Sequence, residues 1–313
     1  MVRFLLRRTG AGVVLVFFIS TLTFGLVHVM GGNPARAILG QNATHEQVAA
    51  KAAELGLNRP VGTQYADWLR AAIRGDFGDS WFTHQPVAKT LSDRLPVTLS
   101  VVIVATVLSA MISVVLGTVA AVRRGWVDRA VQILAVAGFA LPGFWLALVL
   151  SLTFAVRLGW FPATGFVPLG TSVGGWLGSV ALPSLALSVG LIASVAYQVR
   201  GSLIDVLRQD YIRTLRSRGL PERNVIYRHA LRNAAAPALA VIGLQFVGLL
   251  GGTVLVEKVF ALPGIGSVAV SATTAGDIPL VMGLVVTMIV IVVVVNLLLD
   301  IVYGWLNPKV RVR

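Results

Sequence analysis

The stretch LVMGLVVTMIVIVVVVNLLLDIVY, residues 280–303, decides the fold class, because a single charged residue, Asp300, interrupts an otherwise uncharged and mostly apolar run. A helix needs about 20 consecutive, predominantly apolar residues to cross a bilayer, and this run is long enough. The whole chain agrees: 56% of its 313 residues are hydrophobic and 12% are charged, against about 25% charged in a typical soluble domain. These values predict an integral membrane protein and disfavour the alternative, a large soluble helical protein.

Five further stretches toward the N-terminus share this character. We predict an all-α membrane protein with six transmembrane helices, at residues 9–30, 99–122, 130–156, 180–199, 234–256 and 280–303. Arg3, Arg7 and Arg8 precede the first stretch, as basic residues precede the apolar core of a signal peptide. The stretch is too long for such a core, however, and no A-x-A cleavage site follows it. We therefore expect it to stay in the protein as a helix.

The distribution of Lys and Arg predicts the orientation of these helices. With both termini in the cytoplasm, the cytoplasmic segments carry 17 of the 26 Lys and Arg residues, among them Lys309, Arg311 and Arg313 of the C-terminal tail, and the external segments carry nine. Short cytoplasmic loops of membrane proteins are enriched in Lys and Arg, so this bias favours cytoplasmic termini. The net charge of +13 is then a topology signal, with phospholipid head groups as its neighbours. No nucleic-acid partner is needed to explain it.

The predicted helices divide the chain into three parts. Residues 1–30 form an N-terminal tail with the first transmembrane helix, and residues 31–98 form a small external helical segment. Residues 99–313 form a five-helix transmembrane core with a cytoplasmic loop at about 200–233.

The external segment carries signals for two short helices. Thr44 followed by Gln47 predicts a capping box at the start of a helix over 44–57. A second helix, within residues 59–78, would present on one side Tyr65, Trp68, Leu69 and Ile73.

The predicted spans hold few groups that could do chemistry. An enzyme or ion-coupled carrier should show ionisable groups inside its spans, because burying charge in lipid is costly. Asn296 and Asp300 share a helix face, and we favour hydrogen bonding between helices over a transport role for them. The glycine-rich stretches 178–190 and 248–252 indicate close packing or bending of helices.

No catalytic, metal or nucleotide motif is found in the sequence. The four histidines, His28, His45, His84 and His229, lack metal-ligand spacing, and no G-x-x-x-x-G-K-[ST] motif is present. We expect no cofactor in this chain. Energy for any transport must then come from another subunit.

The basic stretch RTLRSRGLPERNVIYRHALRN, residues 213–233, is the place where such a subunit would act. Gly219 predicts the end of one helix and Pro221 the start of another. Glu222 falls in the first turn of the second helix, where the helix dipole favours a negative charge. The composition of the stretch leaves two interpretations open: a short helix that docks onto another protein, or an interfacial helix that lies on anionic lipid.

A family resemblance separates these interpretations. DYIRTLRSRGLPERNVIYRHALRNAAAP, residues 210–237, resembles the cytoplasmic signature loop of bacterial ABC-importer permeases of the dipeptide/oligopeptide/nickel type, specifically the B-type transmembrane subunit. Further stretches resemble the family in order and spacing, namely IRGDFGDSWFTHQPV, DRLPVTLSV, RLGWFPATG, LPSLALS, VEKVFALPGIG, DIPLVMG and NLLLDIVYGWLNPKVR. The resemblance covers essentially the whole chain. Arg213, Thr214 and Leu215 depart from the glutamate and alanines that open the general signature.

The resemblance implies a function and its partners. This chain would be the permease subunit of an importer for short peptides in the bacterial cell membrane, bound to a second homologous permease, ABC ATPase subunits and an extracytoplasmic substrate-binding protein. ATP and Mg would bind the partner ATPases only. The same architecture also serves nickel complexes, glutathione or haem. An autonomous secondary transporter or channel and a membrane enzyme are the alternatives from other classes.

The resemblance also implies two sets of site residues. A short cytoplasmic coupling helix would dock into the ATPase. Helical phase places Val225, Ile226 and His229 on one face, which would be the seated face, and Arg223 and Tyr227 away from it. The residues expected to couple to the ATPase are Gly219, Pro221, Glu222, Arg223, Val225, Ile226, Arg228 and His229. Those expected to dock the binding protein are Asp76, Phe77, Gly78, Glu257, Phe260, Pro263 and Gly264.

Overall fold

The computed structural model describes residues 2–30, 33–40 and 42–306, with side chains for 7–29, 33–40 and 42–306. Lys309, Arg311 and Arg313 of the predicted cytoplasmic tail lie outside the described residues. The described residues form helices and no strand; Asp79 and Pro86 make an isolated bridge. This confirms the all-α prediction. Five described helices are long and apolar enough to cross a membrane, or six if one bent pair counts as a span.

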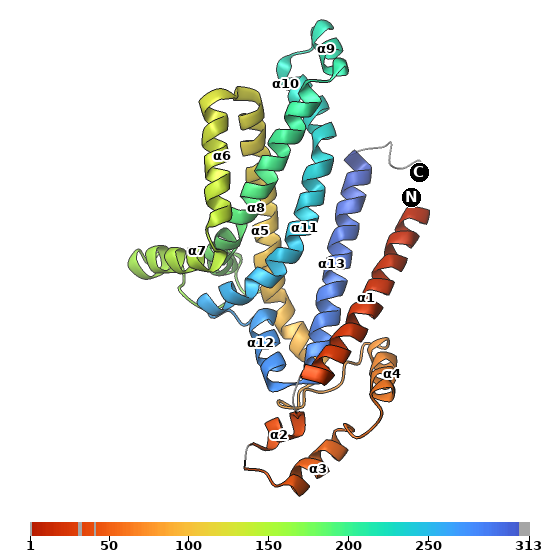
Figure 1. Ribbon diagram of the computed structural model, residues 1–313. Coiled ribbons are helices and arrows are strands. Elements are labelled where there is room, and N and C mark those ends of the chain that lie inside the picture. Colours follow the sequence, from red (N-terminus) through yellow and green to blue (C-terminus); the bar gives the residue numbers. More distant parts are fainter. Residues whose placement is uncertain (1, 31–32, 41, 307–313) are drawn as a thin grey trace. The chain divides into compact units, whose positions relative to one another are not determined.

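The chain divides into two compact units. The first unit comprises residues 97–262 and 294–306 of the described chain. Its helices, seen in Figure 1, are most of α5 (Val87–Arg123), α6 (Gly125–Ala140), α7 (Gly143–Leu150), the π-helix η1 (Ser151–Arg157), α8 (Val173–Leu207), α9 (Asp210–Ser217), α10 (Glu222–Asn224), the π-helix η2 (Val225–Ala230), α11 (Leu231–Val259) and the end of α13 (Ile278–Leu306). Helix α8 is central, since it packs against α6, α7 and α11.

Small and polar side chains let these helices approach one another closely. A Cβ atom added at Gly117 of α5 would lie 2.7 Å from the carbonyl oxygen of Ala196 in α8. On the same pair of helices, the hydroxyl of Ser109 donates to the carbonyl of Ser188 at 3.2 Å. Close backbone contact and interhelical hydrogen bonds replace the hydrophobic effect as the main attraction between helices in lipid.

The glycines that make the closest contacts are not the ones marked by the sequence. In the stretches 178–190 and 248–252, an added Cβ would meet a neighbour at 3.4 Å at Gly252 and nothing within 4 Å at Gly190. Tighter positions in the first unit include Gly117 and, facing Asn296 of α13, Gly243 of α11. Glycine content alone does not reveal which helix face meets a neighbour.

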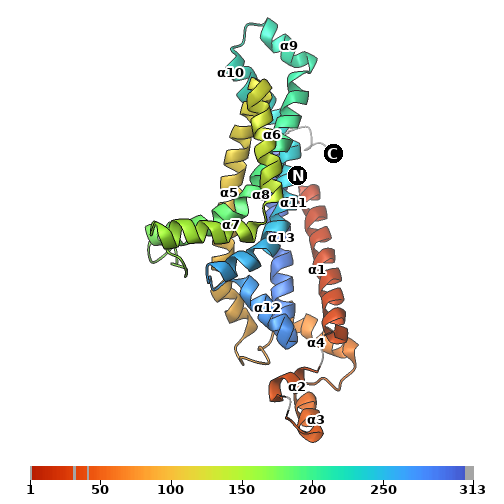
Figure 2. The same ribbon diagram turned by 60° about the vertical axis from the view of Figure 1, so that its left-hand side comes forward.

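The span predicted over residues 130–156 is not a single helix. Its two halves, α6 and the pair α7–η1, meet at an angle of 96°, which Figures 1 and 2 show from two sides. The break falls at Leu141, whose backbone is extended, and at Pro142, which precedes the first residue of α7. Proline lacks a backbone donor and pushes the residue before it out of the helical region, so the helix ends there.

The second unit comprises the described residues up to 96 together with residues 263–293. Its helices are α1 (Val2–Met30), α2 (Pro34–Leu39), α3 (His45–Glu54), α4 (Val61–Ala72), the first turns of α5, α12 (Ile265–Ala275) and the start of α13. The capping box is confirmed: the Thr44 hydroxyl accepts from the Gln47 amide at 3.3 Å, and the Gln47 side chain accepts from the Thr44 amide at 3.0 Å.

Helix α4 is the predicted second short helix, and it packs on α1. The hydroxyl of Tyr65 lies 3.0 Å from that of Ser20 and 2.8 Å from that of Thr21. Tyr65 and Trp68 pack against a buried cluster that includes Phe24 of α1. Ile73, which was expected on the same side, follows the end of α4 and is 78% exposed.

Candidate functional site

The basic stretch folds into a reversal at one end of the first unit. Helix α8 ends at Leu207, α9 runs from Asp210 to Ser217, and the chain turns back at Gly219 into α10. Gly219 has a φ of +76°, and an added Cβ would meet nothing within 4 Å. Glycine is therefore required at position 219 by the backbone conformation alone. Pro221 precedes the first residue of α10, so the predicted end and start of the two helices are confirmed.

The predicted short coupling helix is not a separate helix. Residues Glu222–Val259 form one continuous helical span, in which α10 passes through η2 into α11. The π-helical turn covers Val225–Ala230. Such turns are rare and are frequently found at functional sites.

The residues assigned to the face that contacts the ATPase are all at least partly buried within this chain. Val225 is fully buried in a cluster with Leu203 of α8 and Ile212 of α9, and Ile226 is 6% exposed. His229 is half-buried. Helical phase correctly placed Val225 and Ile226 on one side, but that side faces the chain's own helices. Among the described residues the surface of this segment is formed by Glu222, Arg223, Asn224, Tyr227 and Arg228.

An ion pair closes the reversal. Arg216 of α9 donates from Nη2 to Oε1 of Glu222 at 2.6 Å and from Nε to Oε2 at 3.0 Å. This two-bond geometry is the strong form of an Arg–carboxylate contact. The hydrogen bond that Arg216 donates to Glu222 raises the pKa of Arg216 above its ordinary value. Glu222 therefore holds α9 and α10 together, in addition to any contact with a partner.

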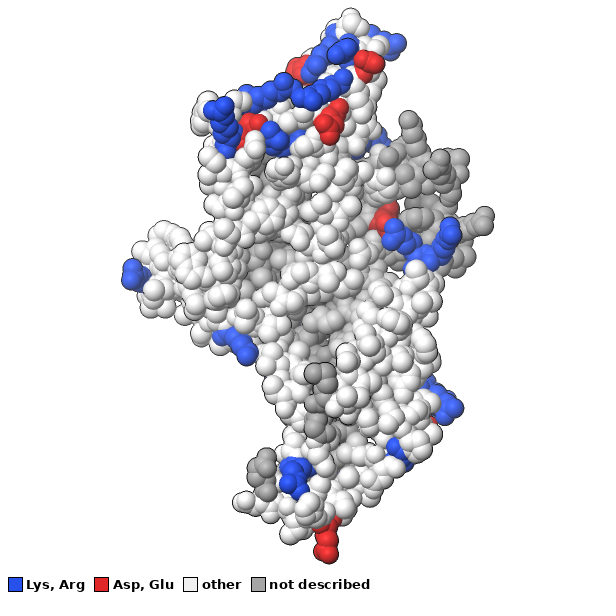
Figure 3. Space-filling model, viewed as in Figure 1, with Lys and Arg blue, Asp and Glu red and all other residues white. Residues whose placement is uncertain are grey.

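Basic side chains gather at this end of the unit. Figure 3 shows Lys and Arg over α9, α10 and the start of α6, with a few acidic residues among them. The exposed arginines here are Arg123, Arg124, Arg129, Arg208, Arg213, Arg216, Arg218, Arg223 and Arg228. One acidic residue of α6, Asp128, pairs with Arg200 of α8, whose Nη2 lies 2.5 Å from Oδ2 of Asp128. Of the nine exposed arginines, Arg213 pairs with Asp210 and Arg216 with Glu222, so most of the cluster remains available to an anionic or acidic surface.

The residues expected to dock a binding protein lie in both units. In the first unit Glu257 is 1% exposed and Phe260 is 2% exposed. The Glu257 carboxylate accepts from the Thr98 hydroxyl at 2.5 Å. Both side chains are buried within this chain, so they do not lie on the surface where the prediction placed them.

The rest of that set belongs to the second unit. Asp76, Gly78 and Pro263 are exposed, and Gly264 is buried at the start of α12. Phe77 packs partly against the buried cluster of Val87 and Leu91. Of the predicted docking residues in this unit, three remain on the surface and Gly264 does not.

A buried carboxylate that the sequence did not single out organises this region. Asp277 is 2% exposed and accepts from the Ser80 hydroxyl at 2.5 Å, from the Trp81 amide at 3.3 Å and from the Leu280 amide at 3.4 Å. The last bond places Asp277 at the N-terminus of α13, where a carboxylate is favourable. Asp277 thereby ties the loop around Ser80 to the start of α13. Its position in the stretch DIPLVMG, just before an apolar run, was the available signal.

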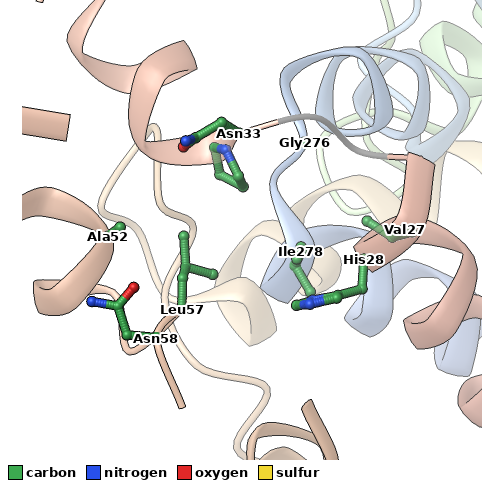
Figure 4. Close-up of a pocket in the computed structure, with 9 residues that line it drawn as sticks. Val27, His28, Asn33, Ala52, Leu57, Asn58, Gly276 and Ile278 are labelled. Atoms are coloured by element: carbon green, nitrogen blue, oxygen red, sulfur yellow. The ribbon is translucent and has the colours of Figure 1, made fainter. Parts of the chain in front are cut away.

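The second unit also contains a cavity of about 240 Å³. Figure 4 shows His28 of α1, with Asn33 and Asn58, among the side chains around it. Asn33 uses its side-chain oxygen to accept from the Arg36 amide at 3.2 Å, and His28 stacks on Phe24. Nowhere in the described chain do three or more His, Cys, Asp or Glu residues gather as metal ligands would.

The first unit contains a larger groove of about 540 Å³. It is lined by apolar residues of α5, α8 and α11, and Arg228, Arg232, Tyr227 and Trp305 lie among its lining residues. Arg228 was predicted to couple to the ATPase, and the structure places it at this groove.

Comparison with known proteins gives matches over nearly the whole chain. Residues 113–312 match the family described as "Binding-protein-dependent transport system inner membrane component", and residues 1–102 match its N-terminal companion family. A Brucella abortus (strain 2308) protein named for a peptide transport system permease is 39% identical over 312 residues, 99% of each chain. The glutathione transport system permease of Escherichia coli (strain K12) is 35% identical over 314 residues, all of both chains.

Proposed function

Because this chain belongs to the family of binding-protein-dependent transport system inner membrane components, we propose that it is the permease subunit that passes short peptides into the cytoplasm. The observation that carries the proposal is the full-length similarity to relatives named for peptide and glutathione transport. The absence of a P-loop motif from the sequence supports a division of labour in which other subunits bind ATP and Mg.

The proposed orientation follows from the charge distribution. Both termini and the basic end at α9 and α10 face the cytoplasm, and residues 31–98 lie outside. The bend between α6 and α7 is compatible with six spans in which the third is broken. Asp76, Gly78 and Pro263 are the predicted docking residues that stay exposed, so we assign them to the extracytoplasmic binding protein. A second homologous permease completes the pathway.

The proposed coupling surface is the exposed tip of the reversal. Arg223 and Asn224 are exposed on α10, next to the Arg216–Glu222 pair. The tip and α11 are one continuous helix, so a displacement of the tip by a closing ATPase would be carried directly into the transmembrane core. ATP then shifts the population between inward-open and outward-open states through its different contacts with each.

Glutathione is the second candidate substrate, because a full-length relative is named for its transport. Glutathione is itself a tripeptide, so both candidates require a pathway for a small charged molecule with amide groups. No described feature favours nickel complexes or haem over these two.

The uptake of a labelled tripeptide in a strain lacking this chain tests the proposal. We expect uptake to fall to the background of a strain without the importer, and plasmid-borne protein to restore it. Unlabelled di-, tri- and pentapeptides should compete in the wild type, while nickel and haem should not. Stronger competition by glutathione than by any other unlabelled peptide would make glutathione the favoured substrate. Unchanged tripeptide uptake, in a strain with no second peptide importer, would contradict the proposal.

A further inference from the structure

The apolar groove in the first unit combines two kinds of lining. Its walls are apolar and include Val114 of α5, Val199 of α8, and Leu239 and Ile242 of α11. Along the continuous helix of η2 and α11, Arg228, Arg232, Ala235, Leu239 and Ile242 follow at steps of four, three, four and three residues. That spacing puts them on one face of the helix. The two arginines therefore lie at one end of the groove, and apolar side chains line the rest.

The polar end is held in place by the end of α13. Arg232 donates from Nε to the carbonyl of Leu306 at 3.0 Å and from Nη2 to the carbonyl of Trp305 at 3.3 Å. Its other N–H groups are left for a ligand, because a guanidinium has five. Within the described part of the chain, the side chain of Arg228 makes no hydrogen bond or ion pair, and no acidic side chain lines the groove.

Two exposed aromatic residues accompany the arginines. Tyr227 is 58% exposed and Trp305 is 67% exposed, and both line the groove. Tyr and Trp are enriched where a membrane protein meets the head-group region, because their rings are apolar with one polar end. Basic pockets between membrane helices on the cytoplasmic side are known to bind anionic lipid head groups.

We propose that this groove is a binding site for one anionic phospholipid, with its phosphate between Arg228 and Arg232 and an acyl chain along α11 toward Ile242. The apolar walls suit hydrocarbon, whereas the amide groups of a peptide would lose their hydrogen bonds to water there. The C-terminal segment NPKVRVR, residues 307–313, carries Lys309, Arg311 and Arg313 and no acid, so its charge does not complement the arginines. The proposal does not depend on which solute the transporter carries.

Photocrosslinking in the assembled transporter tests this site. The full chain, with its partner subunits, is reconstituted in phosphatidylcholine vesicles that contain phosphatidylglycerol with a photoreactive acyl chain. We expect saturable labelling of residues 235–242, competed by unlabelled phosphatidylglycerol and not by added phosphatidylcholine. Each arginine near a head group contributes roughly 1 kcal/mol, so Arg228→Gln should raise the half-competing concentration about five-fold. Arg218→Gln, a matched change at an exposed arginine that lies outside both the groove and the proposed coupling surface, should leave it unchanged.

A second variant separates a defined site from general attraction to a basic surface. Ala235 lines the groove and is half-buried, so Ala235→Phe should fill the groove and abolish saturable labelling while both arginines remain. Equal labelling by charged and uncharged probes, or labelling that is indifferent to Arg228→Gln and to Ala235→Phe, would overturn the proposal. Absence of labelling in the assembled transporter would also overturn it, and would indicate that a partner subunit covers the groove. None of these outcomes bears on peptide uptake.

Discussion

Gly219→Val is expected to reduce peptide uptake at least ten-fold while the chain still inserts into the membrane. Gly219 holds a φ of +76° with no neighbour that a Cβ would touch. A non-glycine residue in the left-handed region costs of order 1–3 kcal/mol, and a β-branched side chain is the least tolerated there. A reversal that relaxes out of this conformation would misplace the tip that carries Arg223. Because 1.4 kcal/mol changes an equilibrium constant ten-fold, a strain of this size is enough for a ten-fold loss of uptake. ATP hydrolysis and uptake of the reconstituted transporter are the measurements.

A substitution series at Gly219 isolates the backbone as the cause. Asn tolerates the left-handed region better than other residues with a side chain, so uptake should fall in the order Gly, Asn, Ala, Val. Gly201 of α8 is a matched control position, because an added Cβ meets nothing within 4 Å there and its φ is not positive. Full uptake by the Val variant, or an effect of Gly201→Ala as large as that of Gly219→Ala, would contradict this account.

Asp277→Ala is expected to destabilise the second unit by about 3 kcal/mol. The change leaves the buried Ser80 hydroxyl and two backbone amides without their acceptor, and each unsatisfied buried donor costs about 1–3 kcal/mol. Hydrogen exchange at the Trp81 and Leu280 amides should become about 100-fold faster, since 1.4 kcal/mol is a factor of ten. Hydrogen-exchange mass spectrometry of the purified chain measures this directly.

Asp76, an exposed carboxylate of the same unit, provides the control for this prediction. Asp76 is exposed and accepts from the amide of Gly78 at 2.9 Å, so Asp76→Ala should change exchange little. Asp277→Asn keeps an acceptor for the backbone amides and should fall between alanine and wild type. Unchanged exchange at Trp81 in Asp277→Ala would show that Asp277 does not hold this loop.

The sequence was sufficient where local chemistry decides the structure. Apolar runs predicted the long helices, Thr44 and Gln47 predicted a capping box, and Gly219 with Pro221 predicted the end of one helix and the start of the next. These features depend on residues that are close in the chain. The bend at Pro142 was missed because the apolar character continues on both sides of it, although proline was the available signal.

What the sequence could not give was the side of each helix that faces its own chain. Val225 and Ile226 were correctly placed on one face of the coupling segment, but that face is buried against α8 and α9. Glu257 was expected to dock the binding protein, and it is buried against Thr98, which is distant in sequence. The helical periodicity of a sequence shows which residues share one face of a helix. It does not show which neighbour those residues meet.

The location of the ATPase contact is the most direct test of the coupling account. The chain has no cysteine, so a single cysteine introduced at one position reports that position alone. In the assembled transporter, a photoreactive maleimide on Arg223→Cys is predicted to crosslink to an ATPase subunit in high yield, and the same reagent on Val225→Cys is predicted to give little product. Crosslinking from Val225→Cys with none from Arg223→Cys would contradict the account, because it would place the buried face of the segment against the partner.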